Sequence, residues 1–220
     1  MCGARISQVD RIAVLVTSGP ATPLMASTTL AGQRAMQTDP SSILDAAFFD
    51  RPAQIVARDL LGRTLVRRFK GKRIALTVTE TEAYLGSHDL ASHAARGRTA
   101  RTETMYGPPG TLYVYLVYGL HWMLNVVTEP VGYPAAVLIR GAGHLSGPGR
   151  LASAIHIDAA LNGKHAASHS GLWFETGEEA GSVIATPRIG VDYAGPRWSS
   201  RKLRFVLRNA YQDLRPVRGR

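Results

Sequence analysis

The alternation of apolar and polar positions is clearest between residues 73 and 84, RIALTVTETEAY. Apolar side chains up to Val78 stand at even positions, and small or hydroxylated ones stand between them, which is the period of a half-buried strand. The same parity, continued along the chain, turns Glu80, Glu82 and Tyr84 inward. The pattern therefore predicts a strand that carries two carboxylates on its buried face.

Two β-hairpins are predicted around this strand. The first joins TLVRRF, residues 64–69, through KGKR to the strand at 73–84. The second follows the bend GPPG at 107–110 and joins TLYVYLVYG to HWMLNVVT, residues 121–128. A further strand, AAVLIRG, is expected at 135–141. The expected fold class is therefore α+β: a single domain with a curved, mostly antiparallel sheet flanked by short helices.

Tyr118 stands at the tip of the second hairpin. In the strand before it, Leu112 and Val114 share one face and Tyr113 and Tyr115 the other. An exposed aromatic side chain at a tip can act as a wedge between base pairs. The alternative is a tyrosine packed on its own hairpin, as is common in β proteins.

Two short helices are predicted. In residues 50–62, Asp50 can cap, Pro52 suits the first turn and Gly62 can end the helix. Its apolar stripe consists of Ile55, Val56 and Leu60. The segment GPGRLASAIHI, residues 147–157, predicts a turn that enters a second helix.

Charge narrows the class of partner. Lys and Arg number 26 against 16 Asp and Glu, for a formal net charge of +10. Such an excess indicates a polyanionic partner, nucleic acid or an anionic membrane surface. No apolar run reaches the roughly 18–20 residues that span a bilayer, and no basic amphipathic helix stands out. Nucleic acid is the better candidate, and we expect no membrane association.

Cysteine and histidine usage argues against a metal centre. The chain has one cysteine, Cys2, which excludes an intrachain disulfide and a thiolate zinc site. His88 and His93 lie near Asp89, but their spacing matches no standard ligand pattern. We therefore expect no metal. The compartment expected is the cytoplasm if the chain is bacterial and the nucleus if it is eukaryotic.

The ends of the chain differ in composition from its centre. Residues 1–41 show no sustained period and are read as a tail or a misassigned start, which leaves residues 42–220 as the domain. The last 33 residues are rich in arginine, including Arg188 and Arg204, as expected of a phosphate-tracking surface or a solvated tail.

The carboxylates suggest acid–base chemistry. A carboxylate on an apolar face loses hydration, which raises its proton affinity and makes it a plausible general base near neutral pH. Alternatively, a bulge turns Glu80 and Glu82 outward, or an arginine neutralises them. Asn125 and Arg140 are polar residues among apolar neighbours, so each is either satisfied structurally or turned toward a ligand.

Seven strings together resemble the alkyladenine (3-methyladenine) DNA glycosylase family. In chain order they are ETEAYLG, the histidine eleven residues after its second glutamate, RGRTAR, MYGPPGTLYVYLVYGLHWMLNVV, AAVLIR, GPGRL and PRIGV. They cover the chain from about Phe48 to Phe205, in the family's order and spacing. The first and fourth strings are the distinctive ones.

The resemblance implies roles for particular residues. Glu82 matches the general base that activates water, Arg140 a residue that holds the water and carboxylate, and Ile189 a backbone carbonyl that binds the water. The other matches, listed by role, are the base pocket at Tyr84, His93, Tyr115 and Asn125, and the intercalating side chain at Tyr118. Candidate phosphate contacts, beside these matches, are Arg96, Arg98, Arg101, His121 and Arg150.

The implied activity is excision of alkylated or deaminated purines from double-stranded DNA by a monomer, without metal or cofactor. No lysine stands in the site motifs, which argues for a monofunctional enzyme without a Schiff-base step. A cationic alkylated purine would gain about 1–2 kcal/mol by stacking on aromatic rings. Thr102 departs from the family, which often has asparagine there.

Two other readings stay open at this point. A catalytically silent protein could use the same basic surface and wedge to bind distorted DNA. A glycosidase could use Glu82 with Glu80 or Asp89, since paired carboxylates cleave sugars. Glu80 and Glu82 lie on one strand face, however, only about 7 Å apart along the strand, with no room for a sugar between opposing acids.

Overall fold

The structure, a computed structural model, describes residues 42–213, so the predicted tail at 1–41 lies outside the described residues. The described residues belong to one compact unit, Thr38–Arg220. Short helices stand between groups of strands in it, and every strand pairing within residues 42–213 is antiparallel. The predicted α+β class with an antiparallel sheet is therefore confirmed.

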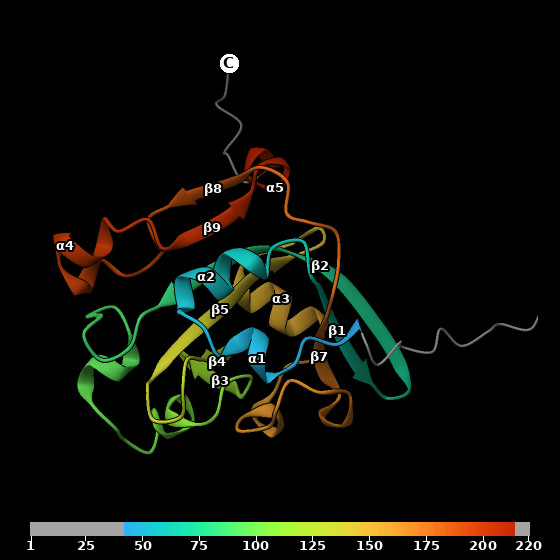
Figure 1. The fold of residues 1–220 in the computed structure, drawn as a ribbon, viewed down its shortest axis with the longest axis horizontal. Helices are drawn as coiled ribbons and strands as arrows, with labels where there is room; N and C mark the ends of the chain where they lie inside the picture. Colours follow the sequence, from blue (N-terminus) through green and yellow to red (C-terminus); the bar gives the residue numbers. More distant parts are fainter. Residues whose placement is uncertain (1–41, 214–220) are drawn as a thin grey trace, which may run out of the picture. The chain divides into compact units, whose positions relative to one another are not determined.

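Nine strands of the described residues form the sheet, with β3-β4-β5-β2-β1-β7 as its main path. Their bounds are β1 Thr64–Phe69, β2 Lys72–Tyr84, β3 Leu112–Val117, β4 His121–Thr128, β5 Ala135–Ala142, β6 Leu145–Ser146, β7 Leu172–Glu175, β8 Val183–Thr186 and β9 Arg204–Leu207. β6 pairs with β5, and the β8–β9 hairpin joins the sheet through β2. Figure 1 shows this hairpin, in orange and red, between α4 and α5.

Strand β2 is the axis of the sheet. Its first half, from Lys72 to Thr77, pairs with β1. Its second half lies between two strands, since Glu80 to Glu82 pair with β9 on one side and with β5 on the other. The residues Glu80–Glu82 are thus held by neighbouring strands on both edges, which fixes the side chains they carry.

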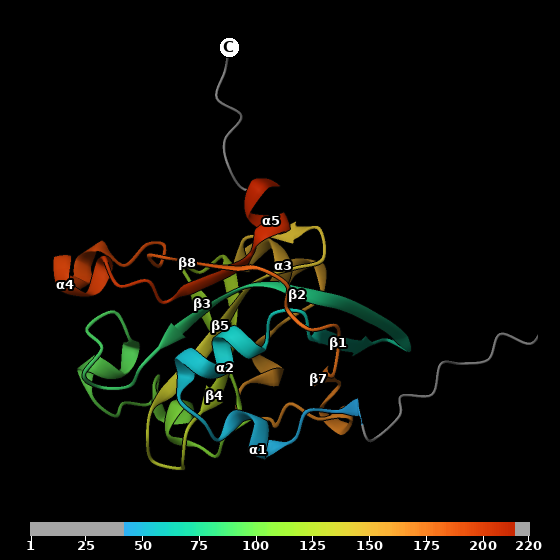
Figure 2. The same ribbon diagram turned by 45° about the horizontal axis from the view of Figure 1, so that its top comes forward.

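The helices are short and most of them cover one face of the sheet. They are α1 Ala46–Phe49, α2 Ala53–Asp59, α3 Pro148–Ala154, α4 Pro196–Ser199 and α5 Arg208–Asp213. Residues of α1, α2 and α3 join one hydrophobic core with the sheet, including Phe49, Val56 and Leu151. Figure 2 shows α1 and α2 in front of the strands. The opposite face is covered by single turns of 3-10 helix, among them η2 His93–Arg96, η3 Glu103–Tyr106 and η6 Asp192–Ala194.

A pair of register shifts changes which face the acids occupy. The pairing of β2 with β5 runs from Val78↔Ala142 to Glu80↔Gly141 and then to Thr81↔Ile139, so each strand carries one extra residue. Val78 therefore packs in the main core, but beyond the shift it is Thr81 and Ala83 that face α2. The expectation that Glu80 and Glu82 share a face with Val78 was wrong, because a bulge reverses the alternation of side chains. The acids are nevertheless buried, on the other face of the sheet.

The first predicted helix begins later than expected. Asp50 does not cap it but ends α1, and Pro52 precedes the first turn of α2 without a side-chain cap. Ile55 is 44% exposed, so it does not belong to the buried stripe. The buried residues of this segment are Ala53, Val56, Ala57 and Leu60.

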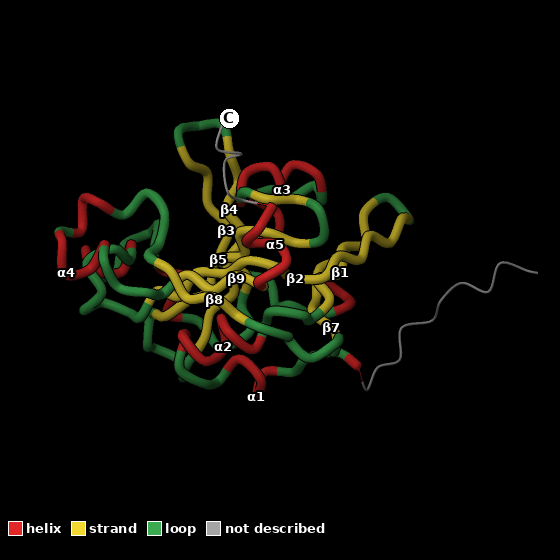
Figure 3. Tube along the Cα trace, turned by 90° about the horizontal axis from the view of Figure 1, so that it is seen from above, coloured by secondary structure: helices red, strands yellow, loops and turns green. Residues whose placement is uncertain are grey.

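Two hairpins turn through the same backbone conformation. Lys70 and Gly71 between β1 and β2, and Tyr118 and Gly119 between β3 and β4, all have φ between 48° and 76°. Two successive residues of positive φ make the tight turn that matches strand twist. Figure 3 shows both hairpins extending outward from the other elements. Tyr118 is 92% exposed, as predicted for a hairpin tip.

None of the helices within residues 42–213 has the length and apolar character needed to cross a bilayer.

Candidate active site

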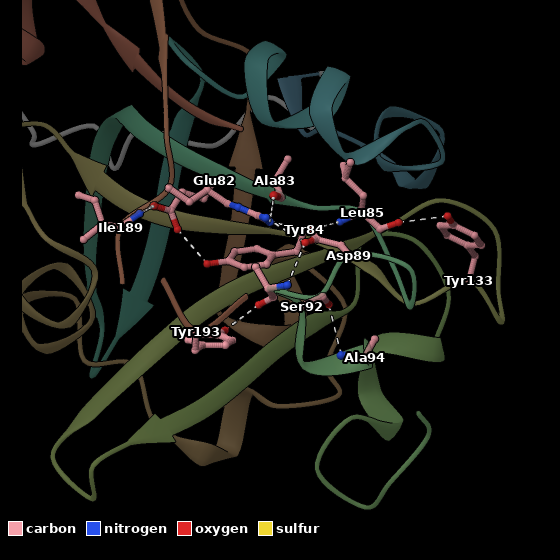
Figure 4. Close-up of polar contacts among 12 residues, drawn as sticks. Glu82, Ala83, Tyr84, Leu85, Asp89, Ser92, Ala94, Tyr133, Ile189 and Tyr193 are labelled. Carbon is pink, nitrogen blue, oxygen red and sulfur yellow. Dashed lines mark hydrogen bonds and ion pairs between the residues drawn. The ribbon is translucent and has the colours of Figure 1, made fainter. Parts of the chain in front are cut away.

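Glu82 is the most deeply buried acid of the bulged strand, with none of its surface exposed. Three donors reach its carboxylate. The Tyr84 hydroxyl donates to Oε2 at 2.9 Å, and the Ile189 backbone N–H donates to Oε1 at 2.8 Å. Arg140 Nη1 lies 3.4 Å from the same Oε1. Figure 4 shows Tyr84 and Ile189 approaching the carboxylate from different sides.

Burial and bonding act on this carboxyl in opposite directions. Burial raises the pKa of Glu82 above its ordinary value, whereas Arg140, the Ile189 N–H and the Tyr84 hydroxyl each lower it. Burial is the largest of these effects. The result is a carboxylate that binds a proton more readily than an exposed one, as a general base near neutral pH requires.

Tyr84 connects Glu82 to a second buried ion pair. Arg188 donates to both carboxylate oxygens of Asp89, at 2.6 and 2.9 Å, and its guanidinium carbon lies 4.8 Å from the centre of the Tyr84 ring. Both of these charged side chains are completely buried. Arg188 is therefore not part of an exposed basic surface, contrary to the expectation for the C-terminal arginines. Its place follows from a partner 99 residues away, which no local pattern could indicate.

An aromatic pocket opens beside Tyr84. Its lining comprises Tyr84, Ala91, Ser92, His93, Met105, Tyr113, Tyr115, Asn125, Ala136 and Tyr193. All four residues that the sequence assigned to a base pocket are among them.

His93 and Tyr115 form one wall of this pocket. Their rings meet edge to face, with centroids 4.6 Å apart, and His93 Nδ1 lies 3.0 Å from the Tyr113 hydroxyl. Burial, then the charges of Arg101 and Arg96, lower the pKa of His93 to about 4. His93 is therefore neutral at physiological pH and can hydrogen-bond a ligand without adding charge.

Asn125 is buried on β4 and one of its polar groups is already committed. Its side-chain N–H donates to the Tyr113 carbonyl at 3.0 Å. This bond fixes the amide at the pocket wall. Asn125 thus has a structural partner and also faces the pocket, so the two alternatives that its sequence context left open both apply.

Arginines already lie against the pocket tyrosines. Besides Arg188 over Tyr84, the guanidinium carbon of Arg101 lies 5.4 Å from the centre of the Tyr115 ring. A cationic ligand stacked on either ring would share it with a resident positive charge, which reduces its cation–π gain.

The structure brings most of the predicted site residues together. Glu82, Arg140 and Ile189 meet at one point, and the four pocket residues surround the adjoining space. Ile189 contacts Glu82 through its N–H, whereas the sequence assigned a role to its carbonyl. Tyr118 lies apart, on the tip of the hairpin that carries Tyr115.

The five candidate phosphate contacts are all exposed and form two groups. Arg96, Arg98 and Arg101 belong to the loop at the pocket mouth, although Arg98 is engaged by Glu103 at 2.6 and 2.8 Å. Thr102 is buried and closes this loop with bonds to Gly97 and Thr99. His121 and Arg150 line a groove beside the second hairpin.

Several residues of the site were missed. Tyr113 lies on the same strand face as Tyr115, so the alternation could have included it. Tyr193 lines the pocket from η6, and its hydroxyl donates to the Ala91 carbonyl at 2.8 Å, a contact between residues 102 positions apart. No local signal marks it. His88, Asp89 and His93 do not converge on a metal site, and within residues 42–213 no three such side chains do.

Comparison with known proteins identifies relatives of this chain. A family model described as methylpurine-DNA glycosylase matches residues 47–145 and 142–211. A protein of Methanocella arvoryzae named "Putative 3-methyladenine DNA glycosylase" is 45% identical, over 76% of this chain and 94% of its own length. Proteins of the same name from Myxococcus xanthus and Anaeromyxobacter dehalogenans are 43% and 42% identical, over 76% and 79% of this chain and 91% and 87% of their own.

Proposed function

The chain belongs to the methylpurine-DNA glycosylase family, and from this premise we propose that it excises alkylated or deaminated purines from duplex DNA after turning the nucleotide into the aromatic pocket. It is a DNA glycosylase, a hydrolase of N-glycosyl bonds that serves DNA repair. The observation that carries the finer proposal is Glu82, a fully buried carboxylate bonded to the pocket residue Tyr84.

The proposed reaction needs one general base. Ionised Glu82 accepts a proton from water while the water oxygen bonds to the anomeric carbon, and the bond from that carbon to the purine nitrogen breaks. The purine leaves with the electron pair of that bond. In an N-alkylated purine the positive charge of the ring receives this pair, so the leaving base needs no added proton. Arg140 and the Ile189 N–H hold the carboxylate in place.

We expect hydrolysis without a covalent intermediate, that is, a monofunctional enzyme. The described residues that line the pocket include no lysine that could form a Schiff base with the sugar. The same lining supports a proposed preference for flat, aromatic ligands, because tyrosine rings and an imidazole bound the space. We also propose that the protein acts on damaged DNA as a monomer.

The test is single-turnover excision from duplexes that carry hypoxanthine, ethenoadenine or a methylated purine. Glu82→Gln should slow excision by at least about 100-fold, because it removes the general base while keeping the side-chain shape. Its affinity for the lesion should stay within about tenfold of wild type. Glu178→Gln, the same change at an exposed acid outside the pocket, is the control.

Other outcomes of this test point elsewhere. Equal losses of excision and of binding in Glu82→Gln would assign Glu82 a structural role. If the wild type bound lesions selectively but released no base, the protein would be a silent binder of distorted DNA.

Tyr118 is proposed as the wedge that fills the gap left by the flipped nucleotide. A left-handed backbone costs a bulky residue about 1–2 kcal/mol, and Tyr118 adopts φ 52° with its ring exposed to solvent. A strained, exposed aromatic at the tip next to the pocket strand favours a contact outside the protein. Filling the gap recovers part of the unstacking energy, which is a few kcal/mol.

Tyr118→Ala should weaken lesion binding by about 1–3 kcal/mol, the usual contribution of an aromatic ring stacked on a base. The measurement is fluorescence anisotropy with lesion duplexes in the Glu82→Gln background, which leaves the substrate intact. Lys70→Ala is a matched control, because Lys70 occupies the same turn position in the first hairpin. Unchanged affinity and unchanged base flipping in Tyr118→Ala would exclude the wedge.

A further inference from the structure

Glu80 is a second buried carboxylate beside the site, and the proposed reaction does not use it. Only 3% of its surface is exposed. Its Oε1 accepts hydrogen bonds from two arginines, from Arg140 Nε at 2.8 Å and from Arg204 Nε at 2.6 Å. Arg204 lies on β9, 124 residues away in sequence and directly opposite Glu82 in the strand pairing.

The four side chains form a chain of charges: Arg204, Glu80, Arg140 and Glu82. Arg140 contacts both carboxylates, through Nε to Glu80 and through Nη1, at 3.4 Å, to Glu82. With Arg204 the set has two positive and two negative charges when both acids are ionised. Without Arg204, one buried arginine would face two buried carboxylates, an arrangement in which one acid takes up a proton.

The backbone irregularity explains how these residues meet. The extra residue in β5 falls at Arg140, and the one in β2 falls beside Glu80, so the shifts in register occur where the ion pair forms. Bulges re-aim side chains in this way next to active sites. Arg204 is supported from β8, since its Nη1 lies 3.4 Å from the Thr186 hydroxyl.

We propose that Arg204 is a positioning residue of the excision reaction: it holds and neutralises Glu80, which leaves the charge of Arg140 available to keep Glu82 ionised. This inference rests on the proposed function of Glu82 as the general base. The charge of Glu80 raises the pKa of Glu82, and the charge of Arg140 lowers it. Whether Glu80 is paired with Arg204 therefore decides how strongly the negative charge of Glu80 acts on Glu82.

Other groups also face Glu82, and all of them stay unchanged in the test. Tyr84 on β2 and the Ile189 N–H donate to it. Three further side chains interact electrostatically with Glu82: Tyr115 on β3, Arg188 and Tyr193. Because these groups are common to every variant below, a change in the pH profile reports the Glu80–Arg204 pair.

The experiment measures single-turnover excision against pH with an N7-methylated guanine, whose permanent charge removes the need to protonate the leaving base. Arg204→Met should shift the low-pH limb of the profile upward by about one pH unit, since it leaves an excess negative charge beside the base. Its rate should approach that of the wild type at high pH. Glu80→Gln should shift the limb downward, and Arg204→Lys should stay close to the wild type.

The double variant Glu80→Gln/Arg204→Met separates charge from packing. It has lost both members of one pair, so its profile should return to within a few tenths of a pH unit of the wild type. A loss of rate that is the same at every pH, or one that the double variant deepens, would overturn the proposal and make Arg204 only an anchor for β9.

A ¹³C NMR titration of the Glu82 carboxyl provides a readout without DNA. It should show the same shifts, upward in Arg204→Met and downward in Glu80→Gln, whether or not a given lesion is excised. Failure of the wild type to excise any lesion would therefore reject the proposed function. Identical Glu82 titrations in wild type and Arg204→Met would reject this inference.

Discussion

The two faces of the β2–β5 pair are equally buried but have opposite contents. On one face, Thr81, Ala83 and Ile139 lie against α2 and the main hydrophobic core. On the other face, Glu80 and Arg140 carry full charges, although they stand only one or two positions in sequence from the residues of the first face. The difference arises from neighbouring positions on the same two strands.

Burial therefore has opposite energetic signs on the two faces. Removing apolar surface from water contributes about 25 cal/mol per Å² to stability. Removing a carboxylate from water costs several kcal/mol unless partners compensate it. The apolar face thus stabilises the fold. Burying the charged face costs free energy of folding, and the proposed chemistry of that face requires this burial. If this division holds, substitutions on the two faces should separate stability from activity.

The largest expected effect on stability comes from the apolar face. Ile139→Ala should lower the free energy of unfolding by about 2–5 kcal/mol, because the Ile139 side chain is fully buried and its truncation leaves a cavity. Excision per folded molecule should change less than about threefold well below the unfolding temperature, even though Arg140 is the next residue. Urea unfolding and single-turnover excision measure the two quantities.

Ile139→Val is the conservative control for this prediction and should cost about 0.5–1.5 kcal/mol. A large loss of excision in Ile139→Ala, in protein that is still folded, would show that the two faces are coupled. The bulge next to Arg140 would then transmit the packing change, and the comparison of faces would fail.

The fold was largely accessible from the sequence because its signals are local. The hairpin from Thr64 to Tyr84 follows from alternation interrupted by a Lys-Gly turn, and the tip at Tyr118 follows from the same reasoning. Burial of Glu82 was also expected, but on the wrong face. A bulge depends on the register of the partner strand, and one sequence alone does not contain that register.

The site was less accessible because its contacts span long distances in sequence. Arg188 and Arg204 looked like surface charge, yet their partners Asp89 and Glu80 lie 99 and 124 residues earlier. Tyr193 reaches the pocket from a single 3-10 turn. The resemblance supplied the roles of Glu82 and of the pocket aromatics, whereas the second layer of ion pairs required coordinates.

The smaller expected effect concerns the charged face and has the opposite sign. Burial raises the pKa of Glu82, so the folded state disfavours the ionised form relative to the unfolded chain. The stability that Glu82 contributes is fully present below about pH 4.3, the ordinary pKa of a glutamate in the unfolded chain. This stability is lost as the pH rises through the higher pKa of Glu82 in the folded state. The amide introduced by Glu82→Gln stays neutral at every pH. The difference in unfolding temperature, variant minus wild type, should therefore increase as the pH rises from 5 to 8.

Differential scanning fluorimetry of both proteins across this range measures that difference, with Glu178→Gln, the same change at an exposed acid, as the control. A difference that declines with pH would mean that Arg140, Tyr84 and the Ile189 N–H outweigh burial, with the ionised carboxylate stabilising the fold. A rising difference, together with lost excision, would mean that removing the base makes the protein more stable. Glu82 would then be kept ionised at the expense of stability, unlike Ile139 one strand away, whose burial serves the fold alone.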